Sequence, residues 1–114
     1  METLLPETDR AHLSGEFADY VAECLRRGVA HGIDGWVDDC LAFARDWGFD
    51  LEGVERVSIW HGADDLMVPF GHGRWLANAL GPGADRRLLY DEGHLTILVG
   101  RIEEVVDDAA RFVR

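Results

Sequence analysis

The sequence predicts a mixed α/β fold in which two helices precede a β-α-β-α unit. Three observations lead to this prediction. Apolar residues recur at spacings of three and four over two segments of the first half, as on one face of a helix. Two short segments of the second half are predicted to be strands, the first of them rich in β-branched residues, and glycines follow both. A helical pattern lies between these segments, which implies parallel strands joined by a right-handed crossover.

The first half carries two amphipathic patterns. One begins after Ser14, a suitable N-cap, and ends at Gly28. The other begins with Asp34 as its cap and ends at Gly48. We expect it to bury one face, formed by Trp36, Cys40, Phe43, Ala44 and Trp47. Cys24 and Cys40 both fall on apolar helix faces, so we expect them to be reduced thiols.

The second half alternates strand and helix. Residues 54–60 are rich in β-branched side chains and predict a strand, and residues 86–90 predict a second. Between them, residues 71–80 predict a helix that stops at Gly81-Pro82. After Gly93-His94, the spacing of apolar residues predicts one amphipathic helix to the C-terminus, in spite of Gly100.

These patterns divide the chain into a helical segment, residues 1–53, and a β-α-β-α portion, residues 54–114. Two parallel strands alone leave an open edge of unpaired backbone groups. We therefore expect the chain to be part of a larger α/β sheet. The alternative is that it completes its sheet by pairing with a second copy of itself.

Composition excludes several classes of function. The 114 residues are 47% hydrophobic, which is typical of one folded domain. Acidic residues outnumber basic ones by 22 to 11, and the net charge of −11 disfavours nucleic acid and anionic membranes as partners. Every basic residue is arginine, so a phosphate-loop or Schiff-base lysine is excluded. With no leader-like start and no long apolar stretch, we expect a cytoplasmic protein.

Chemistry-bearing residues follow both predicted strands. Asp64 and Asp65 come after the first strand, and His94 comes after the second. Ligands of open α/β sheets bind at the carboxyl ends of the strands, so these side chains are expected at one edge. A carboxylate that accepts the imidazole N–H fixes the tautomer and stabilises the imidazolium. We predict that Asp65 and His94 form such a pair, and that Asp64 is a solvated neighbour.

Two motifs in this order resemble the C-terminal acid and histidine motifs of the α/β-hydrolase superfamily. The first is Gly62-x-x-Asp65-x-x-Val68-Pro69, and the second is Gly93-His94. Three flanking segments are similar to segments of esterase-like and lipase-like members: Trp47-Gly48-Phe49-Asp50, Trp60-His61-Gly62 and Gly73-Arg74-Trp75-Leu76-Ala77. The resemblance covers nearly the whole chain, from residue 4 to residue 114, and makes residues 1–53 the counterpart of the cap region.

The resemblance implies serine-type hydrolysis of an ester or similar bond, with Asp65 as triad acid, His94 as general base and no cofactor. The substrate would be small and neutral or hydrophobic. The family's nucleophile stands on a G-x-S-x-G elbow ahead of the acid, and no such elbow occurs here. The two serines, Ser14 and Ser58, lie ahead of a helix and inside a strand. We therefore expect the chain alone to be inactive, with the nucleophile supplied by an N-terminal half or a separate chain.

Other interpretations stay open. The chain could be a non-catalytic remnant or subdomain that forms a homodimer through its open sheet edge. His61 is expected to pack or hydrogen-bond beside the site. It could join Asp65, His72 and His94 at a metal, but their spacing is not that of a known metal site. The four tryptophans are expected in the core or against a further portion of protein: Trp36, Trp47, Trp60 and Trp75.

Overall fold

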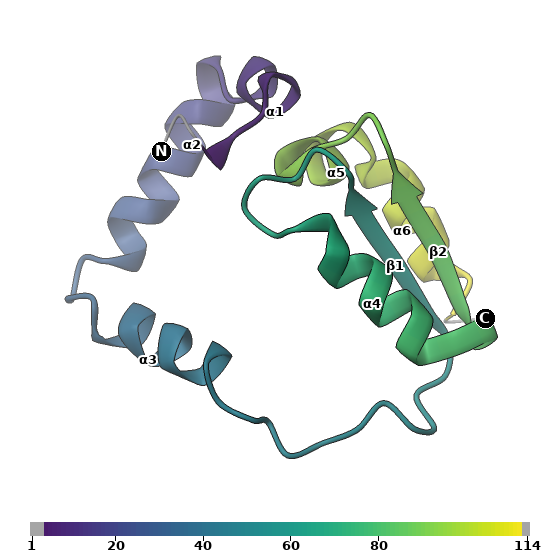
Figure 1. The fold of residues 1–114 in the computed structure, drawn as a ribbon. Helices are drawn as coiled ribbons and strands as arrows, with labels where there is room; N and C mark the ends of the chain where they lie inside the picture. The colour runs from purple at the N-terminus through teal and green to yellow at the C-terminus, as the bar shows by residue number, and fades with distance from the viewer. Residues whose placement is uncertain (1–3, 113–114) are drawn as a thin grey trace. The chain divides into compact units, whose positions relative to one another are not determined.

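A computed structural model describes residues 4–112 and has a mixed α/β architecture (Figure 1). The elements in chain order are α1 (Glu7–His12), α2 (Gly15–Gly28), α3 (Asp34–Phe43), β1 (Val57–Gly62), α4 (Phe70–Leu80), the 3₁₀ helix η2 (Gly81–Gly83), β2 (Ala84–Leu89), α5 (His94–Gly100) and α6 (Ile102–Ala110). The predicted class, N-terminal helices followed by two parallel strands with helices, is confirmed. Among residues 4–112, no helix has the length and hydropathy needed to cross a membrane.

The two strands form a parallel pair with helices on both faces. The register runs from Val57 opposite Ala84 to Gly62 opposite Leu89. Helix α4 covers one face, while α5 and α6 lie on the other (Figure 1). The buried apolar side chains of the described residues come one from each layer: Ile59 of β1, Ala77 of α4 and Ile97 of α5. This three-layer packing fixes where each strand ends relative to the helix that follows it.

The chain divides differently from the boundary expected after residue 53. Residues 4–13 form one compact unit with residues 51–112, and Ser14–Asp50 forms a second unit. Helix α1, which the sequence pattern did not predict, packs against α5 in the first unit. A helix of six residues is too short to show an amphipathic period, which explains why the pattern missed it.

The second unit, taken by itself, has helices where expected but no buried face. Helix α3 ends at Phe43, before the expected stop at Gly48. The side chains of Trp36, Phe43 and Trp47 are 58%, 76% and 60% exposed, so the expected burial of this face is wrong for this unit. Cys24 and Cys40 are free thiols as expected, but both are exposed. Two short helices present too little surface to one another to enclose a core.

Local interactions explain the early end of α3. The Trp47 indole Nε1 donates a hydrogen bond to the carbonyl of Ala42 at 2.7 Å. The Trp47 ring also lies 6.2 Å from that of Phe43 and 6.1 Å from that of Phe49. The chain therefore folds back after Phe43, because the indole takes a carbonyl that a longer helix would use.

Strand boundaries differ from the predicted ones by up to three residues. Strand β1 begins at Val57 rather than Val54. Arg56 has a φ of +60°, a left-handed conformation that a strand cannot contain. Strand β2 spans Ala84–Leu89 rather than 86–90. The β-branched composition located the first strand, but the turn before β1 decided where that strand begins.

The single C-terminal helix expected from the apolar spacing is two helices. Arg101, with a φ of −121°, separates α5 from α6. Its guanidinium donates to Glu92 at 2.7 Å and to Glu104 at 2.8 Å, which holds the break in place. Gly100 precedes it, and because glycine is a poor helix former, interrupting the helix here costs little free energy. The last residues of the expected helix, 113 and 114, lie outside the described residues.

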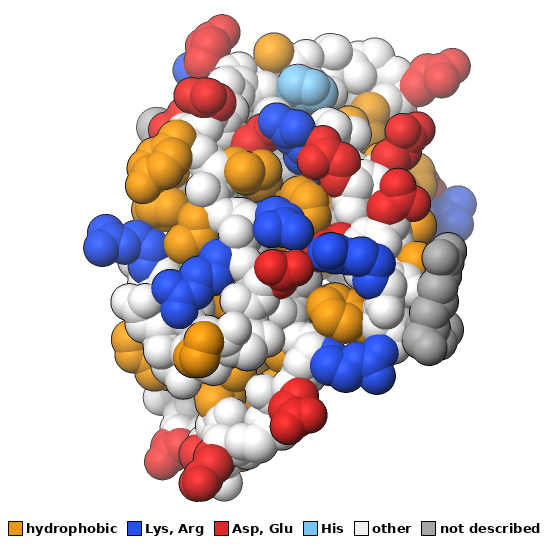
Figure 2. Space-filling view, turned by 90° about the vertical axis from the view of Figure 1, so that its right-hand side faces the viewer, with side chains coloured by type: hydrophobic (Ala, Val, Ile, Leu, Met, Phe, Trp, Pro, Cys, Tyr) orange, Lys and Arg blue, Asp and Glu red, His pale blue; other side chains and the backbone are white. Residues whose placement is uncertain are grey.

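Arginine and acidic side chains are interspersed on the face shown in Figure 2. In the first unit, Arg87 and Arg111 both pair with Asp85, at 3.3 and 3.1 Å. Arg111 also pairs with Asp108. Carboxylates that neutralise these guanidinium groups leave them little attraction for a phosphate backbone.

A close approach at the end of β1 yields a stability prediction. A Cβ added to Gly62 would lie 2.1 Å from the carbonyl oxygen of Glu92, in the loop after β2. Gly62→Ala therefore has to separate the two strand ends, and we expect it to lower the free energy of unfolding by about 1–3 kcal/mol. Urea denaturation followed by circular dichroism measures this. In the control Gly71→Ala, the added methyl meets no atom within 4 Å, and the change should stay within about 1 kcal/mol. Equal effects of the two substitutions would contradict the close packing of the strand ends.

Candidate active site at the strand ends

The parallel register brings the loops after β1 and β2 side by side. The N–H of Ala63 donates to the carbonyl of Leu89 at 2.8 Å, and the N–H of Asp64 donates to that of Glu92 at 3.0 Å. Asp65 lies in the first of these loops, and His94 is the first residue of α5, directly after the second. The two predicted site residues therefore stand at one edge of the sheet because β1 and β2 end together.

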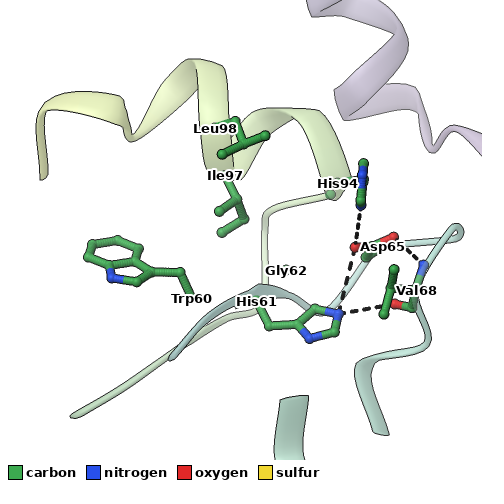
Figure 3. A pocket seen from close by; sticks show the side chains of 9 residues that line it. Trp60, His61, Gly62, Asp65, Val68, His94, Ile97 and Leu98 are labelled. Atoms are coloured by element: carbon green, nitrogen blue, oxygen red, sulfur yellow. Dashed lines mark hydrogen bonds and ion pairs between the residues drawn. The ribbon is translucent and has the colours of Figure 1, made fainter. Parts of the chain in front are cut away.

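Asp65 and His94 are in direct contact. The Nδ1 of His94 lies 2.9 Å from Oδ2 of Asp65 (Figure 3). An ionised carboxylate only accepts, so Nδ1 carries the proton and the neutral ring keeps its lone pair on Nε2. The Asp65 side chain is 6% exposed and that of His94 is 35% exposed. The pair thus has a buried acid and a histidine that a reactant can reach.

The loop holds Asp65 in its ionised form. Its other oxygen, Oδ1, accepts the N–H groups of Met67 and Val68, both at 2.8 Å. Burial by itself raises the pKa of Asp65. The hydrogen bonds from Val68, the His94 ring and Met67 outweigh that effect and hold the pKa of this carboxyl below its ordinary value. At neutral pH the carboxylate is therefore charged and able to orient the imidazole.

His61 supports the loop that carries Asp65. Its Nε2 donates to the carbonyl of Val68 at 3.0 Å and lies 3.6 Å from Oδ2 of Asp65. Its ring meets that of Phe70 edge to face, with centroids 5.7 Å apart. A Cβ on Gly73 of α4 would come within 2.3 Å of the His61 ring, so only glycine leaves room for it. His61 therefore has the hydrogen-bonding and packing role that the sequence suggested.

A cavity of about 280 Å³ opens beside the pair. His94 and Asp65 line it together with the side chains of Trp60, Val68, Ile97 and Leu98 (Figure 3). An apolar wall next to a histidine with a free lone pair suits a small uncharged group, because such a group loses little hydration on entering. The arrangement can bind an apolar group and accept a proton next to it.

Ser58 is hydrogen-bonded to a residue outside the Asp65–His94 pair. Its hydroxyl donates to Asp108 of α6, and the indole Nε1 of Trp60 donates to the same carboxylate at 3.1 Å. Ser58 and Trp60 alternate along β1, so both turn to the face covered by α6. Ser14 belongs to the other compact unit. Ser58 thus has a structural partner in Asp108.

The other polar residues singled out in the sequence do not join the pair in a cluster. Asp64 is exposed, and so is His72 in the first turn of α4. Within residues 4–112, no three histidine, cysteine, aspartate or glutamate side chains come together in a way that could hold a metal ion.

One residue at this site escaped sequence reasoning. Asp9 of α1 is fully buried and accepts hydrogen bonds from three main-chain N–H groups at the start of α5, those of His94, Leu95 and Thr96. It is separated from them by 85 to 87 positions. No local pattern marks it, because an acidic residue in a short helix is ordinarily solvated.

The lowered pKa of Asp65 predicts a dependence of stability on pH. Folding favours the charged form of Asp65, so this carboxylate stabilises the folded chain fully at pH values above the ordinary aspartate pKa of about 3.9. The stabilisation is lost as the pH falls through the lower pKa that Asp65 has in the folded chain. We expect Asp65→Asn to destabilise the chain by about 1–3 kcal/mol at pH 7. The difference from wild type should shrink below pH 4 in urea denaturation across pH. Asp64→Asn, at the exposed neighbouring position, should change the stability at pH 7 by less than about 0.5 kcal/mol. An Asp65→Asn effect that does not change with pH would contradict the assignment.

Comparison with known proteins adds no relative to this picture. No family model, no curated protein and no solved structure matches the chain. What the site can do therefore rests on its own geometry: a buried carboxylate, an accessible histidine and an apolar cavity at the carboxyl ends of two parallel strands.

Proposed function

We propose that this chain is the acid-and-histidine portion of an α/β-hydrolase-fold protein that hydrolyses an ester or similar bond. One observation carries the proposal: the 2.9 Å contact between His94 Nδ1 and Asp65 Oδ2 at neighbouring strand ends. Acid and histidine follow consecutive parallel strands in the order that the family motifs require. Asp65 is then the triad acid and His94 the general base.

In the proposed reaction, a serine hydroxyl from outside these 114 residues adds to the ester carbonyl carbon, and its proton passes to Nε2 of His94. Asp65 stabilises the imidazolium through Nδ1. The proton then moves to the leaving alkoxide as the carbon–oxygen bond breaks. Water, deprotonated by the same nitrogen, attacks the acyl carbon. The bond from that carbon to the serine oxygen breaks as the oxygen takes the proton back from Nε2, which releases the acid and restores the serine. This chemistry needs no cofactor.

The cavity supports a small neutral or hydrophobic substrate. Trp60, Val68, Ile97 and Leu98 give it apolar walls, and His94, the proposed base, also lines it. The chain's net charge of −11 repels anionic substrates. The free thiols of Cys24 and Cys40 support a reducing compartment, and we propose a cytoplasmic location.

The hydrolase proposal predicts a strong dependence on His94. We expect the 114-residue chain alone to hydrolyse p-nitrophenyl butyrate no faster than its His94→Ala variant, because it lacks the nucleophile. With a segment that bears a G-x-S-x-G elbow, either fused or co-expressed from the neighbouring reading frame, His94→Ala should lower kcat/KM by about 10³-fold or more. Asp64→Ala is the matched control and should leave the rate within about twofold.

Two outcomes would overturn parts of this proposal. An unchanged rate in the His94→Ala assembly would remove the triad assignment. Hydrolysis by the chain alone that depends on His94 would mean that a nucleophile lies within these 114 residues.

A second candidate is a non-catalytic subdomain that associates with itself. The observation that favours it is the incomplete sheet: among the described residues, β1 pairs only with β2, so its other edge has unpaired backbone groups. A second copy could supply the missing strand across a two-fold axis and give a four-stranded sheet. An association with an N-terminal half would cover the same edge.

The two candidates differ in their expected mass in solution. Self-association predicts a dimer of the 12.7 kDa chain in sedimentation velocity at about 50 µM, a concentration at which a micromolar dimer is mostly formed. A proline in the middle of β1, as in Ile59→Pro, removes a backbone donor and should abolish the dimer. Ile59 is a core residue, so loss of the dimer counts only if circular dichroism shows that Ile59→Pro is folded. Trp75→Glu, at an exposed position of α4, should leave the dimer intact. A monomer at this concentration contradicts the self-association candidate.

A further inference from the structure

Two carboxylates hold His94 at two points. Its main-chain N–H donates to Oδ2 of Asp9 at 2.8 Å, and its ring Nδ1 donates to Oδ2 of Asp65 at 2.9 Å. The first bond fixes where the residue's backbone lies, and the second fixes where its ring points. A rotation of the backbone at His94 would carry the ring away from Asp65, so the second bond depends on the first.

The contact between Asp9 and α5 is closely built. Oδ1 of Asp9 accepts the N–H groups of Leu95 and Thr96 at 2.9 and 3.0 Å. A Cβ on Gly93 would lie 2.5 Å from both carboxylate oxygens, so the carboxylate fits only beside a glycine. The N–H of Gly93 turns away from Asp9 and donates to the Thr96 hydroxyl at 2.6 Å. Every N–H group from residue 93 to residue 96 is thereby satisfied.

Asp9 has a property that an ordinary N-cap lacks. An N-cap residue precedes its helix directly, whereas Asp9 lies on α1 and is buried with no exposed surface. A buried carboxylate is stable only where hydrogen-bond donors replace water, and the N-terminus of α5 offers three together with its positive dipole end. The position of α5 is therefore tied to α1 through this one charge.

We propose that Asp9 is a positioning residue that sets the ring of His94 against Asp65. The assignment of His94 as a base rests on the proposed hydrolase function, but the positioning itself is a statement about geometry and can be tested without turnover. Asp9→Asn has the same shape, yet it presents an NH₂ group where one or more main-chain N–H groups now donate. The start of α5 should shift, and the His94 ring should lose its fixed contact with Asp65.

The first readout is the Nδ1–H proton of His94 in the NMR spectrum of the 114-residue chain. A proton held between an imidazole and a carboxylate resonates far downfield and exchanges slowly enough to be seen. Its loss in both His94→Ala and Asp65→Asn assigns it. In Asp9→Asn we expect this resonance to move upfield or to broaden beyond detection while circular dichroism shows a folded chain. Glu7→Gln, an exposed change in the same helix, should leave it in place.

The outcomes separate positioning from mere structural support. A folded Asp9→Asn chain with an unchanged resonance would overturn the proposal, because Asp9 would then stabilise α5 without setting the ring. If Asp9→Asn does not fold, the same resonance is followed in Asp9→Ser, whose hydroxyl can still accept one N–H. There too, an unchanged resonance overturns the proposal and an altered one supports it.

A kinetic arm links the inference to the proposed function. In an assembly that hydrolyses p-nitrophenyl butyrate, Asp9→Asn should lower kcat with little change in KM, and Glu7→Gln should change neither. A wrong hydrolase proposal would give no His94-dependent turnover at all, while the NMR result would still decide the role of Asp9. If turnover depends on His94 but not on Asp9, the hydrolase proposal stands and the positioning inference fails.

Discussion

The buried carboxylate of Asp9 is the constraint on which the first unit depends. A charge without exposed surface is tolerated only where donors replace its water, and three N–H groups at the start of α5 do so at 2.8 to 3.0 Å. The same groups are the ones a helix N-terminus leaves unsatisfied. The Asp9 carboxylate and the N–H groups of α5 therefore satisfy one another's hydrogen bonds. This contact joins α1 to a helix whose first residue lies 85 positions further along the chain. Because His94 is the first residue of that helix, the contact that closes the unit also places the histidine.

Two further buried carboxylates organise the two sides of β1. Asp65, just after the end of β1, accepts hydrogen bonds from the His94 ring and from two N–H groups of its own loop. On the face that α6 covers, Asp108 accepts hydrogen bonds from Ser58 and Trp60 and forms an ion pair with Arg111. The alternation of side chains along β1 sends His61 to the opposite face, where it braces the Asp65 loop. A small apolar core is thus supplemented by polar contacts that are specific in direction, and these contacts keep the two strand ends in register.

The two compact units differ in how many of their side chains are buried. The first buries side chains from three layers, whereas no residue of Ser14–Asp50 is buried. Large aromatic side chains of the second unit, such as Trp36 and Phe43, are more than half exposed. Apolar surface that is exposed to this extent costs free energy in water and is typical of surfaces that bind another protein. This exposed apolar surface and the open edge of β1 are the parts of the described chain that the proposed N-terminal half or second copy would cover.

Local patterns in the sequence were sufficient for the fold class, for α2 and α4, for the location of both strands and for the pairing of Asp65 with His94. Each of these depends on residues close together in the chain or on the rule that parallel strands end at one edge. The sequence did not reveal α1, the break at Arg101 or the role of Asp9, and it led to a wrong expectation for the aromatic face of α3. Those features depend on contacts across the chain: Arg101 breaks its helix in contact with Glu92, and Asp9 is buried only because α5 folds back over it. Periodicity determines which elements form, and only the tertiary structure decides which charges are enclosed and which apolar faces are left open.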